Sequence, residues 1–147
     1  ESDESYEIIN LSNLNKREVK DFLYPLFSEL SNQLSQQIEN YYDDSEDLFG
    51  PVREHTLGTW IKASDDDVEL HIAEFLTLGG MINIIKGHKP LMDRCGFEDN
   101  DEVDKLGGIK DLRNQIMHGN RTLVNKQETL KKHLDRIERA EKIVQRL

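Results

Sequence analysis

Apolar residues recur at helical spacing over most of the chain. In residues 16–42 they fall every three or four positions, as in a helix with one buried face. Asn15 can cap this helix, since Glu18 follows three positions later. Pro25 lies inside the pattern, so we expect it to kink or interrupt the helix. The apolar positions are Val19, Phe22, Leu23, Leu26, Phe27, Leu30, Leu34 and Ile38.

The middle of the chain predicts a short helix and then a long one. Residues 43–64 are irregular, and their glycines and proline favour a short, bent helix. Ser64 and the three acids that follow it are typical of a helix start, with the serine as cap. The apolar pattern then predicts one helix to residue 88. The adjacent Gly79 and Gly80 lie inside this helix, where glycine lowers helix stability relative to alanine. The close approach of another helix would explain why glycines occur there.

Two more helices follow the acidic segment 89–106, which we expect to be a loop or partly helical. One runs from about Val103 to His118, and Gly119 is placed to end it. The other begins at Asn125. Their apolar stripes are Ile109, Leu112 and Ile116 in the first, and Leu130, Leu134, Ile137, Ile143, Val144 and Leu147 in the second. Since no repeat and no strand-like alternation is present, the sequence predicts an all-α bundle of four to five helices.

Length and composition fit one helical domain. The 147 residues are enough to bury a core. Residues 1–12 are acidic and polar and are expected to form a linker or arm, which leaves 13–147 as the domain. No apolar run reaches the ~18 residues of a membrane span. Because the chain does not begin with methionine, we expect neighbouring domains outside it.

The lone cysteine and the charge distribution narrow the function classes. Cys95 alone excludes a disulfide framework and a cysteine-based zinc site, and it fits a reducing, cytoplasmic setting. The net charge is −10, which usually argues against nucleic acid. However, residues 1–105 carry −15 and residues 106–147 carry +5. A local positive surface in the last third can therefore hold phosphates, although C-terminal helices often carry basic faces without such a role.

Residues 112–121 read LRNQIMHGNR and begin inside the helix expected to end at His118. Arg113 is followed by the polar Asn114, and four residues separate Arg113 from His118. This motif, late in a helical bundle, resembles the HEPN domains (higher eukaryotes and prokaryotes nucleotide-binding). The flanking residues 109–112 and 121–123 are similar to HEPN domains found behind CBS-type regulatory domains in bacteria.

The resemblance implies a two-fold homodimer that acts as a metal-independent endoribonuclease and needs no cofactor. Two motif helices meet across the axis in this family, so that arginine and histidine from both chains face one cleft. Implied partners are RNA and either a fused regulatory domain or an antitoxin, in toxin–antitoxin systems or phage defence. Some members are not catalytic and serve as dimerisation or nucleotide-binding modules. A plain protein-interaction bundle is the third alternative.

The spacing of the motif agrees with a site built from two chains. Five positions along a helix turn by about 500°, so Arg113 and His118 point about 140° apart. They do not form a pair on one face, and within one chain they converge poorly on a single phosphate. A symmetric partner supplies a second arginine and histidine.

Each motif residue has a chemical role and a simpler alternative. His118 can act as general base or acid, or it can bond the last helix carbonyls. Arg113 can stabilise phosphate charge, or it can pair with Asp111 or a connector acid. Asn114 can orient the phosphate or the histidine, or it can be a solvated or capping amide. Arg121 can add a phosphate contact, although a surface role is expected more often.

Other candidate constellations are weak. The remaining histidines (His55, His71, His88 and His133) lack metal-ligand spacing. The acids at 65–67 are better explained by helix capping than by a metal. Tyr41 and Tyr42 can stack on bases, but a core or interface role is expected. Asn120 stands where some toxins of this family carry a modifiable tyrosine, so silencing through that tyrosine is not supported.

Overall fold

The computed structural model describes residues 17–117 and 127–147. Helices make up all of its regular structure, and no β-strand occurs in these two ranges, which confirms the all-α prediction. The helices are shorter and more numerous than the four to five expected. In chain order the elements are α2 (Arg17–Tyr41), η2 (Ser45–Leu48), α3 (Glu54–Asp65), η3 (Ile72–Phe75), α4 (Leu78–Ile85), α5 (Lys89–Cys95), α6 (Asn100–Asp104), α7 (Leu106–Met117) and α8 (Gln127–Arg146).

Helix α2 is the longest element, and it continues through Pro25. Of the predicted kink or interruption at this proline, the interruption is therefore wrong, and the kink stays a prediction. Pro25 itself is exposed, so its ring faces water. The opposite face of α2 is held by burial of Leu23, Phe27, Leu30, Leu34 and Ile38, each at most 7% exposed. Burial of this stripe outweighs the missing backbone hydrogen bond at the proline.

The long helix predicted for residues 64–88 is also wrong. Ser64 lies in the last turn of α3 and does not cap a following helix. The acids beside it terminate α3, where Asp67 has a left-handed backbone with φ 62°. Asp tolerates that conformation better than most residues. Helix α4 starts later, where the Thr77 hydroxyl accepts a hydrogen bond from the Gly80 amide at 3.0 Å.

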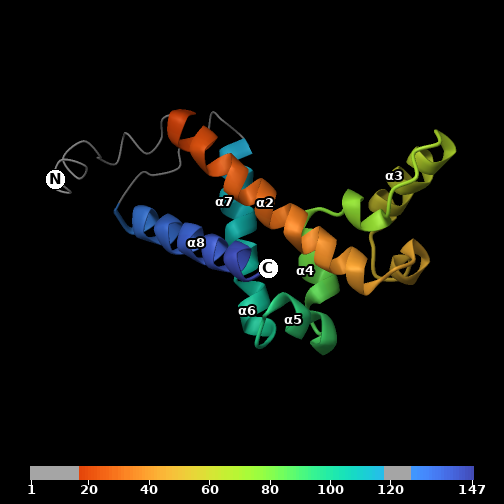
Figure 1. Cartoon of the computed structure of the whole chain (residues 1–147). Coiled ribbons are helices and arrows are strands. Elements are labelled where there is room, and N and C mark those ends of the chain that lie inside the picture. Colours follow the sequence, from red (N-terminus) through yellow and green to blue (C-terminus); the bar gives the residue numbers. More distant parts are fainter. Residues whose placement is uncertain (1–16, 118–126) are drawn as a thin grey trace.

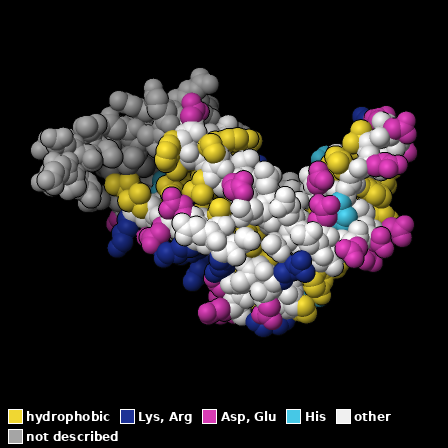
Figure 2. All heavy atoms as spheres, viewed as in Figure 1, with side chains coloured by type: hydrophobic (Ala, Val, Ile, Leu, Met, Phe, Trp, Pro, Cys, Tyr) yellow, Lys and Arg dark blue, Asp and Glu magenta, His cyan; other side chains and the backbone are white. Residues whose placement is uncertain are grey.

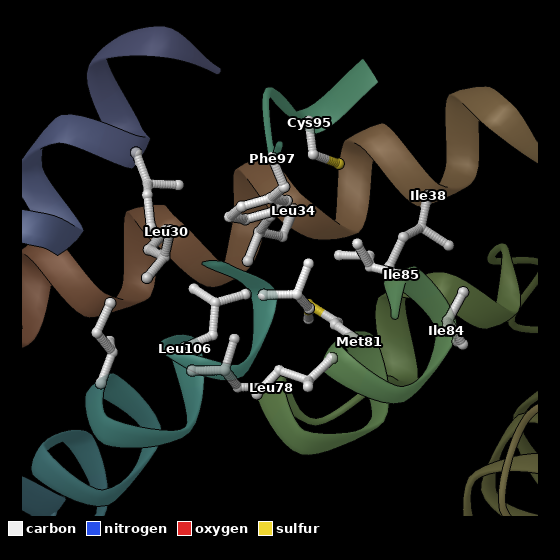
Figure 3. Packing of buried hydrophobic residues seen from close by; sticks show 14 of the residues in the cluster. Leu30, Leu34, Ile38, Leu78, Met81, Ile84, Ile85, Cys95, Phe97 and Leu106 are labelled. Carbon is white, nitrogen blue, oxygen red and sulfur yellow. The ribbon is translucent and has the colours of Figure 1, made fainter. Parts of the chain in front are cut away.

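The core lies where α2 crosses α4 and α7. Figure 3 shows Leu34 and Ile38 of α2 on the side of Met81 and Ile85 of α4, and Leu30 of α2 above Leu106. Leu106 of α7 and Phe97, which follows α5, close the cluster. The segment 89–106 is partly helical, as predicted, because α5 and α6 form within it. This cluster fixes α7 along its whole described length.

Helix α3 stands away from the core (Figure 1). Thr56 is its only buried residue, and its main contact is with η3. At the other end of the chain, α8 packs on α2 and α7. Its predicted apolar stripe is confirmed at Ile143, which is 2% exposed, but Leu134 is 53% exposed. No helix in the described residues is long and apolar enough to cross a membrane.

Candidate functional site on the motif helix

Helix α7 carries the described part of the motif and has two distinct faces. Its buried face is Leu106, Ile109, Leu112 and Ile116, each at most 6% exposed. Three of these four were predicted from the apolar spacing. The face turned to solvent includes Asp111, Asn114 and Met117. The hydrophobic face therefore fixes the rotation of α7, and that rotation decides which motif side chains can meet a ligand.

Arg113 lies at the edge between the two faces and is half-buried. Its guanidinium makes no hydrogen bond or ion pair within residues 17–117 and 127–147. The alternative that Asp111 or a connector acid neutralises Arg113 thus finds no support in the described structure. An arginine whose charge and five donors are uncommitted is suited to binding an anion.

Asn114 is exposed on the solvent face of α7. Its amide makes no side-chain hydrogen bond in the described parts of the chain, and it lies inside the helix, so it is not a cap. Either of its other predicted roles, a solvated amide or a group that orients a ligand, is compatible with this position. If the Asn114 side chain were buried, it could not reach a ligand. Its exposure therefore leaves the ligand-orienting role open.

The other half of the motif lies outside the described residues. His118, Gly119 and Arg121 belong to residues 118–126, between α7 and α8. The predicted roles of His118 and Arg121, and the predicted helix stop at Gly119, remain predictions. The described site therefore consists of Arg113 and Asn114 together with the elements that flank α7.

The glycines of α4 and α7 differ in how closely a neighbouring helix approaches them. A Cβ placed on Gly79 of α4 would lie 3.6 Å from the Lys110 side chain of α7, an ordinary van der Waals distance, and one on Gly80 would meet only residues of its own segment. The close helix approach expected at these two glycines is therefore not observed. A Cβ placed on Gly108 of α7 would lie only 2.8 Å from Nε of Arg136 on α8. Arg136 was not recognised from the sequence, because it follows Arg113 by 23 residues. The only local signal was the glycine pair at 107 and 108.

Two of the remaining histidines, His71 and His88, have partners that fit structural roles. His71 accepts a hydrogen bond from the Ala73 amide at 3.1 Å through Nδ1, and its Nε2 lies 2.6 Å from the Tyr42 carbonyl. His88 contacts the rings of Tyr41 and Tyr42. No group of three potential metal ligands occurs in the described residues.

The tyrosines at the end of α2 contact one another and His88, as the core role predicts. The ring centroids of Tyr41 and Tyr42 are 4.9 Å apart. Burial raises the pKa of Tyr42, and the nearby Tyr41 and Asp47 raise it further. A polar hollow of about 350 Å³ lies between α2 and the η3–α4 segment. None of the predicted site residues lines it, so it is separate from the motif.

Comparison with protein-family models, curated proteins and solved structures gives no match. The resemblance to HEPN domains therefore depends on the motif residues and their place in the helical bundle.

Proposed function

We propose that the chain forms a HEPN-like two-fold homodimer that cleaves RNA without a metal ion. The observation that carries this proposal is the state of Arg113. It lies beside an exposed face of the motif helix, half-buried and without an acidic partner in the described structure. An unpaired arginine at this place in the motif has its donor fork free for the oxygens of a phosphate.

The proposed reaction is a transesterification at one RNA phosphate. The ribose 2′-oxygen attacks phosphorus, and its proton passes to one His118 acting as general base. The bond from phosphorus to the 5′-oxygen breaks, and that oxygen receives a proton from the His118 of the partner subunit, or more slowly from water where only one His118 is present. Arg113 stabilises the negative charge on the pentacoordinate phosphate, and Asn114 orients the phosphate or the imidazole. The products are a 2′,3′-cyclic phosphate and a 5′-hydroxyl.

The test is cleavage of single-stranded RNA in EDTA by wild type, Arg113→Ala and His118→Ala. Removing a general acid–base group lowers rates by about 10²–10⁴-fold, and removing a transition-state donor by about 10²–10³-fold. Arg53→Ala and His55→Ala are matched controls, because both residues are exposed at the start of α3. Equal cleavage by all five proteins would indicate a contaminating nuclease and refute the proposal.

A second candidate is a non-catalytic dimerisation or RNA-binding module of a larger regulatory protein. The acidic balance of residues 1–105, with 24 Asp/Glu against 9 Lys/Arg, favours the dimerisation role, because acidic surfaces repel RNA. In this case RNA is bound but stays intact in the same assay, or the dimer forms without binding RNA. Either result assigns the chain to the second candidate.

A further inference from the structure

The first turn of α7 contains two adjacent glycines with different surroundings. A Cβ on Gly107 would meet nothing within 4 Å. A Cβ on Gly108 would lie 2.8 Å from Nε, 3.3 Å from Cζ and 3.4 Å from Nη2 of Arg136. The guanidinium of Arg136 therefore lies against the backbone of α7, in space that any side chain at position 108 would occupy. Gly108 is the residue that allows this placement.

The charge of Arg136 is not neutralised within the described structure. Its side chain is half-buried and makes no hydrogen bond or ion pair in residues 17–117 and 127–147. Two nearby acids, Asp111 and Asp135, are exposed and form no ion pair with it, and Glu138 pairs with Lys142 at 3.0 Å. Lysine and arginine side chains continue along α8 in Figure 2. Arg136 thus resembles Arg113 in presenting free donors.

The two arginines flank the exposed face of the motif helix. Gly108 and Arg113 are five residues apart, so they are about 7.5 Å apart along the axis. Around the axis they are about 140° apart across the buried face and therefore about 220° apart across the solvent face. Asn114 and Gly107 lie on the solvent side between them. One edge of this face carries Arg113, and the other carries Arg136 of α8.

We propose that Arg136 binds a non-reacting phosphate of the RNA backbone next to the one that is cleaved, and that Gly108 positions it. This inference rests on the proposed function. Guanidinium is preferred for such a contact, because its planar donor fork matches the oxygens of a phosphate. In a two-fold dimer, each protomer contributes one such contact beside the shared cleft.

The test measures binding of a 2′-O-methylated single-stranded RNA, which cannot be cleaved by 2′-oxygen attack. Arg136→Gln and Gly108→Ala are expected to weaken binding by about 3- to 10-fold. Each lost phosphate contact should also reduce the slope of log affinity against log salt by about 0.7. The controls are Gly107→Ala, which adds the same methyl group in open space, and Arg139→Gln, another half-buried arginine of α8.

The outcomes separate this inference from the proposed function. If wild type cleaves RNA and Arg113→Ala does not, but Arg136→Gln binds like wild type, the inference is wrong and the function stands. Equal losses in Arg136→Gln and Arg139→Gln would indicate general charge attraction and also overturn it. If wild type neither binds nor cleaves RNA, the proposed function itself fails. Thermal unfolding of each variant checks that Gly108→Ala still folds, and Arg136→Gln tests the same contact without changing α7.

Discussion

At Cys95, burial changes the chemistry of the only thiol. The side chain is 0% exposed, and burial raises its pKa to about 11, against the opposing charges of Arg94 and Arg146. Because the thiolate is the reactive form, we expect a thiol reagent such as DTNB to modify the native protein slowly at pH 8. Modification should be fast in urea. Fast labelling of the native state would show that Cys95 is accessible.

The same shift predicts how stability depends on pH. The thiol keeps its proton more strongly in the folded state than in the unfolded state, where the pKa is near 9.0. The contribution of the Cys95 thiol to the free energy of unfolding is therefore complete below pH 9. It is lost as the pH rises through about 11. The stability difference between wild type and Cys95→Ala, from urea unfolding, should shrink over this range. A difference that stays constant would contradict the shift.

Burial of single residues could be predicted where it depends only on neighbours along the same helix. The helical phase placed Leu112 and Ile116 in the core and left Arg113 and Asn114 outside it, as the structure shows. It could not find Arg136, because contact with Gly108 depends on how α8 packs against α7. The glycine itself indicates close approach, but it does not name the residue that approaches.

Among the helices, long regular patterns were predictable and short ones were not. The apolar spacing of α2, α7 and α8 is sustained over three or more turns, so one face of each decides its structure. The segment after α3 has similar spacing, yet Val68 and Leu70 are each 42% exposed. Residues with the right period therefore need not form one helix.

Hydrogen bonds from distant residues explain the break after α3. Trp60 donates from Nε1 to the Leu70 carbonyl at 2.8 Å, and the Ile72 amide donates to the Ser45 hydroxyl at 2.9 Å. The His71 ring contacts the Tyr42 carbonyl. These partners lie 10 to 29 residues away, so a local pattern could not reveal them.

Helix α2 offers a stability prediction at Pro25. A proline inside a helix removes one hydrogen bond and crowds the preceding turn, at a cost of about 3 kcal/mol relative to alanine. Since the side chain is exposed, Pro25→Ala should raise the free energy of unfolding by about 1–3 kcal/mol in urea denaturation. Pro90→Ala is the control, because Pro90 is in the first turn of α5, where proline is tolerated. An unchanged free energy of unfolding in Pro25→Ala would contradict the prediction, because it would show that proline costs α2 no stability at this position.

Over the described residues, acidic side chains predominate on α3 and its neighbours, whereas α8 carries six Lys/Arg and four Asp/Glu. Acidic side chains cover the projecting α3 and the segments beside it, whereas lysines and arginines follow α8 (Figure 2). Residues 43–74 contain ten Asp/Glu and two Lys/Arg. Exposed charges separated by more than about 8–10 Å are largely screened at physiological salt. The net charge of −10 is therefore compatible with an RNA surface on α7 and α8.

The proposed two-fold site makes a prediction that a one-chain site does not. A dimer of Arg113→Ala with His118→Ala keeps one arginine and one histidine, each from a different chain. If both chains contribute to one cleft, mixing the two inactive variants should restore part of the cleavage. About half of the dimers in an equimolar, fully exchanged mixture are mixed ones. A site complete within one chain gives no recovery, because neither variant has both residues.

Sedimentation and subunit exchange of labelled protein must show that mixed dimers form. Exchange without any recovered cleavage would contradict a composite site.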